Sequence, residues 1–368
     1  MSRAMAFLAL LLAASLPGAP AAGQSAAPRT ILSGPIRAVR LDYENMARSL
    51  PGLDALEKNL KAAHATMVAL GAGRADWTYF KWRWHRGAWS GDVYNTAVDF
   101  LWRDSRRFGA WAAVDAVVDV LAPRYVAAHP EKAAISWRGV HSRNLVSTTE
   151  LVNGEFGKLL LEMVDYIAAR YPVNSISLTE LDYYIDGYGE DDAASYRLFT
   201  GRKDWPRSAD GSINIDDPSI GQWRSYEVSL FLGRAAAAAH SHGKKLYLDV
   251  QVEWDHLDRA GSSHGQDYPV MLKFADRLVV WDYFGLAGKP AGYTAQVARS
   301  LRKLGSDRII LSVGLWPREG SPVSAKELSV ALRAGLAEGI MNEWVTPSRF
   351  FGSDHWRALA DVWSQSAQ

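Results

Sequence analysis

The sequence predicts an α/β fold, a (β/α)8 TIM barrel with long loops after the second and fourth strands. Eight short apolar segments alternate with helical patterns along the chain, which is the order expected of a parallel β/α architecture. Several of these segments end abruptly in acidic and aromatic residues, as strands do at the functional face of such folds. A doubly wound open sheet is the alternative fold. No glycine-rich phosphate loop follows the first strand, which disfavours nucleotide binding.

The first 23 residues have the composition of a secretory signal peptide. Arg3 precedes an apolar stretch from Ala4 to Leu16, and small residues follow around positions 19–23. The apolar stretch is too short to span a membrane. We therefore expect residues 1–23 to be a signal peptide, residues 24–35 a linker and residues 36–366 a single barrel domain. The mature protein should then be secreted or periplasmic, without a membrane span.

Composition excludes several classes of protein. The chain has no Cys, so disulfides, thiolate chemistry and Cys-ligated metals are ruled out. A net charge of +1 gives no reason to expect a nucleic acid or an anionic membrane as partner. The 15 Trp and 15 Tyr often stand beside charged residues at predicted strand ends. Flat rings next to hydrogen-bonding groups suit sugars, with core packing as the alternative for any one ring.

The first half of the chain yields four predicted strands. Alternation and aromatic content indicate strands, while helical periodicity ending at Gly or Pro indicates helices. The expected order is strand Ile36–Glu44, helix Gly52–Leu70, strand Trp77–Trp84, a long loop over His85–Asp104, helix Gly109–His129, strand Ala133–Trp137, helix Glu155–Tyr171 and strand Ile176–Leu178.

The second half begins with a polar insertion that extends to about Gln222. It is rich in Gly, Pro, Asp and Ser, so we expect a functional loop without a core of its own. Regular alternation follows, and the segment Lys245–Glu253 places Leu246 on one face and Asp249 on the other. The expected order is helix Ser225–His242, strand Lys245–Glu253, helix Tyr268–Ala275, strand Arg277–Phe284, helix Thr294–Leu304, strand Arg308–Leu315, helix Ser324–Glu338, strand Ile340–Val345 and helix Asp354–Ser364.

Carboxylates occur at the ends of five predicted strands. They are Asp42, Glu44, Glu180, Asp182, Glu253, Asp282 and Glu343. Each alone could serve a structural ion pair, but together they predict an acidic bowl at one rim of the barrel. Glycosidic bond hydrolysis needs two carboxyl groups, one protonated as acid and one ionised as nucleophile or base. We expect Glu180 to be the acid/base, with Glu253 or Asp182 as its partner and Glu343 and Asp282 as further catalytic candidates.

Aromatic and polar residues near the same strand ends are the candidates for binding sugar. They are Asp42, Glu44, Trp82, Trp84, Trp137, Arg138, Tyr183, Trp281, Tyr283, Trp316 and Trp344. No metal or other cofactor is expected. His240 and His242 stand at a helix end, where they complement exposed carbonyls, and the acidic pair Asp216-Asp217 follows no recognised Ca²⁺ loop spacing.

The layout also resembles a known group of enzymes. It is carried by a fourth strand ending at Glu180, an acidic and aromatic loop, the DWPR motif at Asp204–Arg207, and strands reading KLYLDVQVE and LVVWDYFG. These features resemble the family-10-like glycoside hydrolases and the hydrolase domain of bacterial poly-N-acetylglucosamine deacetylase/hydrolase proteins, over about Ile36–Trp363. The resemblance implies a barrel that hydrolyses a polysaccharide. Those relatives end the fourth strand in an aspartate-rich motif, whereas this chain has Glu180 and Asp182.

The sequence therefore predicts an exported, monomeric glycoside hydrolase that cleaves a polysaccharide by carboxylate catalysis. The main alternative is a catalytically inactive barrel that binds an exopolysaccharide. A metal-dependent hydrolase is a third possibility, which the scarcity of strand-end His disfavours.

Overall fold

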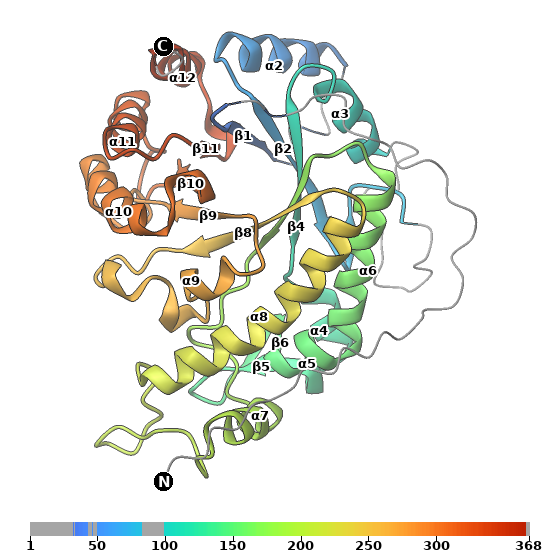
Figure 1. Ribbon diagram of the computed structural model, residues 1–368, viewed down its shortest axis with the longest axis vertical. Coiled ribbons are helices and arrows are strands. Elements are labelled where there is room, and N and C mark those ends of the chain that lie inside the picture. The colour runs from blue at the N-terminus through green and yellow to red at the C-terminus, as the bar shows by residue number, and fades with distance from the viewer. Residues whose placement is uncertain (1–31, 33, 43–45, 47–49, 83–98, 366–368) are drawn as a thin grey trace.

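The fold is a closed barrel of eight parallel strands, as predicted. The computed structural model describes residues 32, 34–42, 46, 50–82 and 99–365, and Figure 1 shows the strands surrounded by helices. In order around the ring, the strands are β1 (Arg37–Leu41), β2 (Met67–Arg74), β4 (Ala113–Asp119), β7 (Ser175–Thr179), β8 (Lys245–Gln251), β9 (Arg277–Asp282), β10 (Ile309–Gly314) and β11 (Glu343–Thr346). The ring closes because β11 pairs with β1, with Trp344 opposite Ala38.

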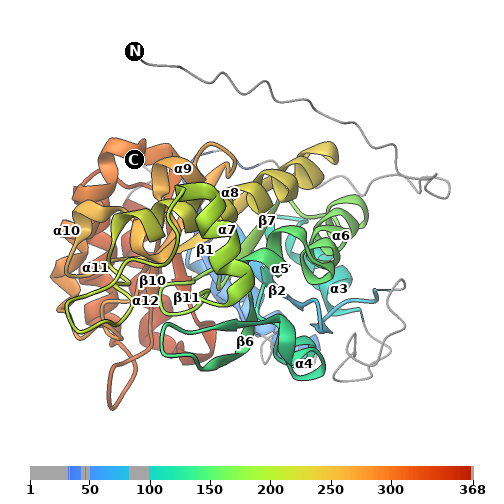
Figure 2. The same ribbon diagram turned by 90° about the horizontal axis from the view of Figure 1, so that it is seen from below.

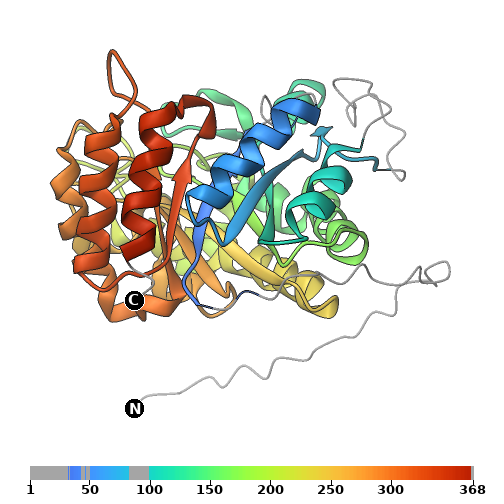
Figure 3. The ribbon, with the colours of Figure 1, turned by 90° about the horizontal axis from the view of Figure 1, so that it is seen from above.

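The helices cover the outer face of this ring. They are α2 (Leu50–Ala62), α3 (Phe100–Phe108), α4 (Pro123–Ala128), α5 (Thr148–Asn153), α6 (Glu155–Arg170), α7 (Glu190–Thr200), α8 (Pro218–Ser241), α9 (Tyr268–Met271), α10 (Thr294–Leu301), α11 (Ala325–Ala337) and α12 (Ser353–Gln365). Their starts follow local chemistry: Ser324 and Glu327 form a capping box on α11, and Asp217 caps α8 ahead of Pro218. Figure 3 shows α2 and α12 side by side where the first and last strands meet.

The barrel strands are buried on both faces, as parallel strands covered by helices must be. Outward side chains pack against the helices in the main core. Inward side chains at the amino-terminal half form an apolar plug in the lumen, which includes Ala38, Met67, Val279, Ile310 and Trp344. The carboxyl-terminal half of the lumen is polar, and this half carries the candidate site.

Two long excursions leave the carboxyl ends of β4 and β7. The first contains an antiparallel pair, β5 (Ala133–Ile135) and β6 (His141–Val146), and the second contains α7. They lie near one another at the bottom of Figure 1, and Figure 2 views the molecule from that side. The excursion after β7 was expected to lack a core, but Tyr196, Trp205 and Trp223 pack into a small aromatic cluster there. The polar residues of this insertion thus surround a core of their own.

Two predicted strands were misplaced. The second barrel strand is Met67–Arg74 rather than Trp77–Trp84, of which Trp77–Thr78 form only a short antiparallel strand, β3. The third is Ala113–Asp119, inside the segment predicted as helix, while Ala133–Ile135 lie outside the barrel. Short apolar runs fit a buried strand and a helix equally well.

Some predictions fall outside the described residues. These are the signal peptide, most of the linker, Glu44 and Trp84. Among the helices that are described, none combines the length and the apolar composition needed to cross a membrane.

Candidate active site

Ionisable side chains line the carboxyl-terminal half of the lumen. On β1, β4 and β8, the residues two positions earlier belong to the apolar plug, so strand alternation turns Arg40, Asp119 and Asp249 inward. Glu180 follows directly after β7, and Asp119 pairs with its neighbour Thr179 across the β4–β7 ladder. The lumen therefore brings two acids and one arginine together beside the predicted acid/base.

Glu180 has a strained backbone. Its φ angle is +68°, in the left-handed region that residues other than Gly rarely occupy. Such strain persists only where the surrounding structure enforces it, and it occurs preferentially at functional sites.

Two buried side chains hold the segment that follows Glu180. The guanidinium of Arg224 is fully buried and donates to the carbonyls of Tyr184 at 3.0 Å and Asp186 at 2.9 Å. The Nε2 of buried Gln266 donates to the carbonyl of Leu181 at 2.8 Å. These bonds satisfy carbonyls of an irregular segment that would otherwise be buried unpaired. They give a physical account of how the Glu180 conformation is maintained.

Asp182 lies next to this segment but is partly committed to other groups. Its Oδ1 lies 2.8 Å from His264 Nδ1 and accepts the N–H of Tyr184 at 3.0 Å. The Tyr184 ring covers His264, with centroids 5.0 Å apart. The Asp182 carboxylate thus ties the loop after β7 to the loop after β8.

The surroundings of Glu180 favour its protonated form. Burial, together with the nearby carboxylates of Asp119, Asp249 and Asp182, raises the pKa of Glu180 to about 7, while the charge of Arg40 acts in the opposite direction. A carboxyl group with this pKa is substantially protonated at neutral pH. Such a group can donate a proton in a reaction.

Asp119 is the neighbouring acid best suited to remain ionised. Burial raises the pKa of Asp119 to about 6, opposed by a hydrogen bond from the Leu121 N–H at 2.8 Å and by the charges of Arg74 and Arg40. Burial also raises the pKa of Asp249 to about 6, but Asp249 is only 3% exposed and accepts the Trp281 indole N–H at 3.1 Å. Asp119 is the more exposed of the two.

Aromatic rings form one wall of the lumen. Trp281 and Tyr283 stack with centroids 5.1 Å apart and planes 10° apart, and Trp316 follows at 5.0 Å from Tyr283. Gly314 makes this wall possible, because a Cβ there would stand 2.3 Å from the Tyr283 ring. Of the predicted sugar-binding aromatics, these three are brought together beside the acids.

Asp282, Glu343 and Trp344 do not face the candidate site. Asp282 points outward and accepts the Thr294 hydroxyl at 2.5 Å. Glu343 begins β11 and accepts the indole N–H of Trp363, on the outer helix α12, at 2.6 Å. Trp344 points into the lumen but belongs to the apolar plug at the opposite end. Strand alternation and position along the strand therefore correct these three expectations.

Four other residues that were predicted to bind sugar make contacts that stabilise the fold instead. Trp82 is buried in the main core because its segment is not a barrel strand. Tyr183 is 1% exposed, and its hydroxyl donates to the carbonyl of Val146 at 3.1 Å. Trp137 and Arg138 stack on each other at the turn between β5 and β6, 4.5 Å from guanidinium to ring. None of these four residues lies at a barrel strand end.

Asp42 and Glu253 stand at the carboxyl ends of barrel strands, but their carboxylates accept hydrogen bonds from loop backbones. Asp42 Oδ2 accepts the N–H of Arg349 at 3.2 Å, which links β1 to the loop after β11. Glu253 accepts the N–H of Ser263 at 3.2 Å and lies 4.0 Å from Arg259. Among the carboxylates, Asp119 has the largest effect on the pKa of Glu180, so Asp119 is preferred to Glu253 as its partner.

Sequence analysis missed Arg40, Asp119 and Asp249 as site residues. The alternation of the Lys245–Glu253 segment already placed Asp249 on the polar face, so this signal was present. Asp119 was hidden by the helical interpretation of its segment. In the part of the chain that the structure describes, no cluster of three or more His, Asp or Glu is arranged to hold a metal.

Comparisons with known proteins identify the fold. No family model and no curated protein match the sequence. Among solved structures, the glycoside hydrolase domain of PgaB (BpsB) from Bordetella bronchiseptica has a TM-score of 0.67 at 20% identity, over 89% of this chain and 99% of that one. A β-galactosidase from the psychrophilic Marinomonas ef1 has a TM-score of 0.66 at 11% identity, over 90% of this chain and 60% of that one.

The catalytic domain of a β-amylase from Paenibacillus polymyxa has a TM-score of 0.61 at 11% identity, over 92% of this chain and all of that one. At such identities these likenesses concern the fold alone. The resemblance to a glycoside hydrolase barrel is thereby confirmed at the level of the fold.

Proposed function

We propose that this chain, which has the fold of glycoside hydrolase barrels, hydrolyses a polysaccharide with Glu180 as the proton donor. The single observation that carries the proposal is the environment of Glu180. A carboxyl group on a strained backbone, with a pKa raised to about 7, stands beside a second acid in a polar lumen. Perturbed carboxyl groups in a cavity are typical of acid and base catalysts.

In this proposal Asp119 is the partner carboxylate. Glu180 donates its proton to the glycosidic oxygen as the bond to the leaving sugar breaks. Asp119, ionised, acts on the anomeric carbon either as nucleophile or by activating a water. Arg40 stabilises the ionised form of Asp119, since its charge lowers the pKa of that group. The wall of Trp281, Tyr283 and Trp316 offers ring faces for the sugar.

We also propose that the protein works outside the cytoplasm as a monomer. The signal-peptide composition of residues 1–23 supports export. The resemblance to the hydrolase domain of poly-N-acetylglucosamine deacetylase/hydrolase proteins makes that polymer the first substrate to test.

The test is whether the wild-type protein releases new reducing ends from soluble poly-N-acetylglucosamine, and how the rate varies with pH. Asp119 must lose its proton, so activity should fall as pH drops through about 6. Glu180 must keep its proton, so activity should fall as pH rises through about 7. A narrow, bell-shaped dependence of the rate on pH is expected between these limits. Binding of the polymer without any release of reducing ends would favour the inactive, exopolysaccharide-binding barrel instead.

A further inference from the structure

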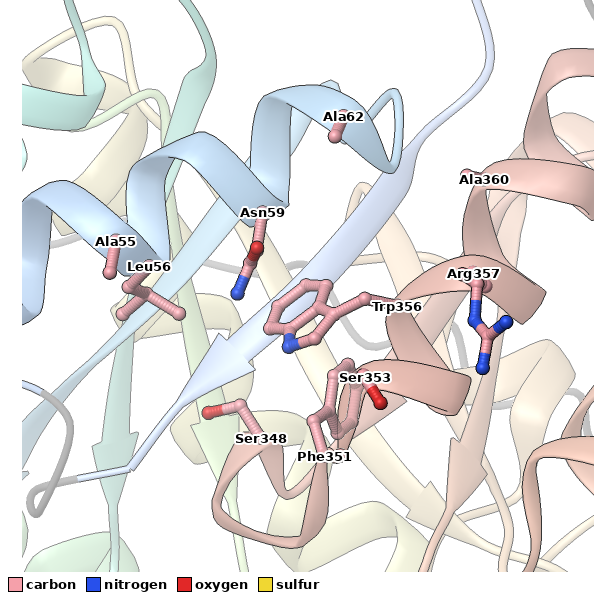
Figure 4. A pocket seen from close by; sticks show the side chains of 11 residues that line it. Ala55, Leu56, Asn59, Ala62, Ser348, Phe351, Ser353, Trp356, Arg357 and Ala360 are labelled. Carbon is pink, nitrogen blue, oxygen red and sulfur yellow. The ribbon is translucent and has the colours of Figure 1, made fainter.

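A groove of about 480 Å³ lies between α2 and α12, outside the barrel lumen. Figure 3 shows the two helices next to each other, and Figure 4 shows the side chains that line the groove. Its volume falls within the range of about 300–1,000 Å³ that is usual for small-molecule sites. The acids and the aromatic wall of the candidate active site take no part in its lining.

The groove places the Trp356 ring beside the Asn59 carboxamide, and the polar groups of both side chains have no partner among the described residues. Trp356 projects from α12 toward Asn59 of α2, with Phe351 beside it (Figure 4). The rings of Phe351 and Trp356 meet edge to face at 4.7 Å, which holds the indole in place. Among the described residues, none hydrogen-bonds to the Asn59 carboxamide or the Trp356 indole N–H. An indole next to an amide suits the faces and hydroxyls of a sugar.

The charge of the groove favours a neutral ligand. Arg357 is the one charged side chain among the described residues that line it, and its guanidinium is paired with Asp354 one turn earlier. Among the described lining residues, a phosphate, a lipid headgroup or an acidic peptide would find no unpaired cation. The remaining polar lining consists of the Asn59 amide and the hydroxyls of Ser348 and Ser353.

One end of the groove adjoins the carboxyl-terminal rim of the barrel, where Glu180 also lies. One of its walls is the loop between β11 and α12, which supplies Ser348, Phe351 and Gly352. This loop leaves the carboxyl end of β11, and Asp42 at the carboxyl end of β1 accepts the N–H of its Arg349. A polymer that crosses the rim of the lumen between β1 and β11 would therefore reach the groove.

We infer that Trp356 and Asn59 form a second glycan-binding site, which holds an uncharged stretch of the same polysaccharide that the lumen binds. The inference rests on the proposed function for the identity of the polymer. A polymer attached at two places binds more tightly than either site alone explains, because the second attachment is intramolecular. A short oligosaccharide cannot span both sites, so the groove does not raise its affinity for the lumen.

The test uses the Glu180→Gln protein, which should bind without cleaving, in native gels that contain soluble poly-N-acetylglucosamine. Adding Trp356→Ala should weaken polymer binding about 10-fold or more, and Asn59→Ala, on the opposite wall, should also weaken it. The affinity of the lumen for a trisaccharide of the same sugar, followed by calorimetry, should not change. Trp102→Ala is the matched control, since Trp102 is 39% exposed on α3 and lies outside the groove.

Three results would overturn the inference. The first is that the polymer does not retard the Glu180→Gln protein, and the second is that retardation is unchanged in both groove variants. The third is a loss of trisaccharide affinity at the lumen equal to the loss of polymer affinity. The proposed hydrolysis can fail separately. If wild-type protein never cleaves the polymer but its retardation depends on Trp356, the second binding site is supported and the proposed hydrolysis is not. If wild-type protein cleaves the polymer and the groove variants bind it normally, the proposed hydrolysis is supported and the second binding site is not.

Discussion

Replacing Glu180 with Gln should lower the release of reducing ends about 1,000-fold, within the range expected for loss of a general acid. Gln keeps the size of the side chain and its polarity but cannot give up a proton to a glycosidic oxygen. Binding of the polysaccharide should persist, because the wall of Trp281, Tyr283 and Trp316 is unchanged. The measurement is a reducing-end assay together with retardation in polymer-containing gels.

Glu343→Gln is the matched control for this experiment. Burial raises the pKa of Glu343 to about 8, so this carboxyl group is largely neutral at pH 7, as the amide would be. Gln can still accept the indole N–H of Trp363. The variant should therefore fold and keep full activity. Equal losses in both variants would point to damaged folding, and undiminished hydrolysis in Glu180→Gln would contradict the assignment.

Replacing Asp119 with Asn should lower hydrolysis about 100-fold or more, as for loss of a catalytic base or nucleophile. It should also move the alkaline limb of any residual activity to lower pH. The direction follows from the charge of Asp119, which raises the pKa of Glu180. Without that charge, Glu180 loses its proton at a lower pH. Rate measurements across pH 5–9 would test both effects.

Asp115→Asn is the control for this change, because Asp115 is on the same strand and also faces inward but lies deeper. It is fully buried and accepts the hydroxyl of Ser175 at 2.5 Å. Its replacement should leave activity unchanged. If Asp182→Asn abolished hydrolysis while Asp119→Asn did not, the partner role would pass to Asp182, as the sequence alone suggested.

The sequence predicted the barrel and the position of Glu180 because both depend on local signals. Strands β7 to β10 have long apolar or alternating patterns, and Glu180 directly follows one of them. The Ala113–Asp119 segment was harder to assign, since a short apolar run fits a buried strand as well as a helix. That ambiguity concealed Asp119. The number of strands nevertheless came out at eight, because each missed strand was replaced by a nearby segment.

The direction in which strand-end side chains point was the other feature that the sequence could not predict. Asp282 and Glu343 are carboxylates on barrel strands, but each faces the helices because strand alternation places it there. A residue on a strand can point to the lumen or to the helices, and a shift of one position exchanges the two. The clamp by Arg224 and Gln266 was also beyond the sequence, since it joins segments about 40 and 85 residues apart.

The most direct measurement is the pKa of the Glu180 side chain itself. The ¹³C resonances of glutamate carboxyl groups can be followed through a pH titration, with Glu180 assigned by its disappearance in the Glu180→Gln protein. A midpoint near 7 is expected, since burial and the neighbouring acids favour the protonated form. A midpoint near the ordinary value of 4.5 would mean that Glu180 is ionised at neutral pH, and it would contradict its role as proton donor.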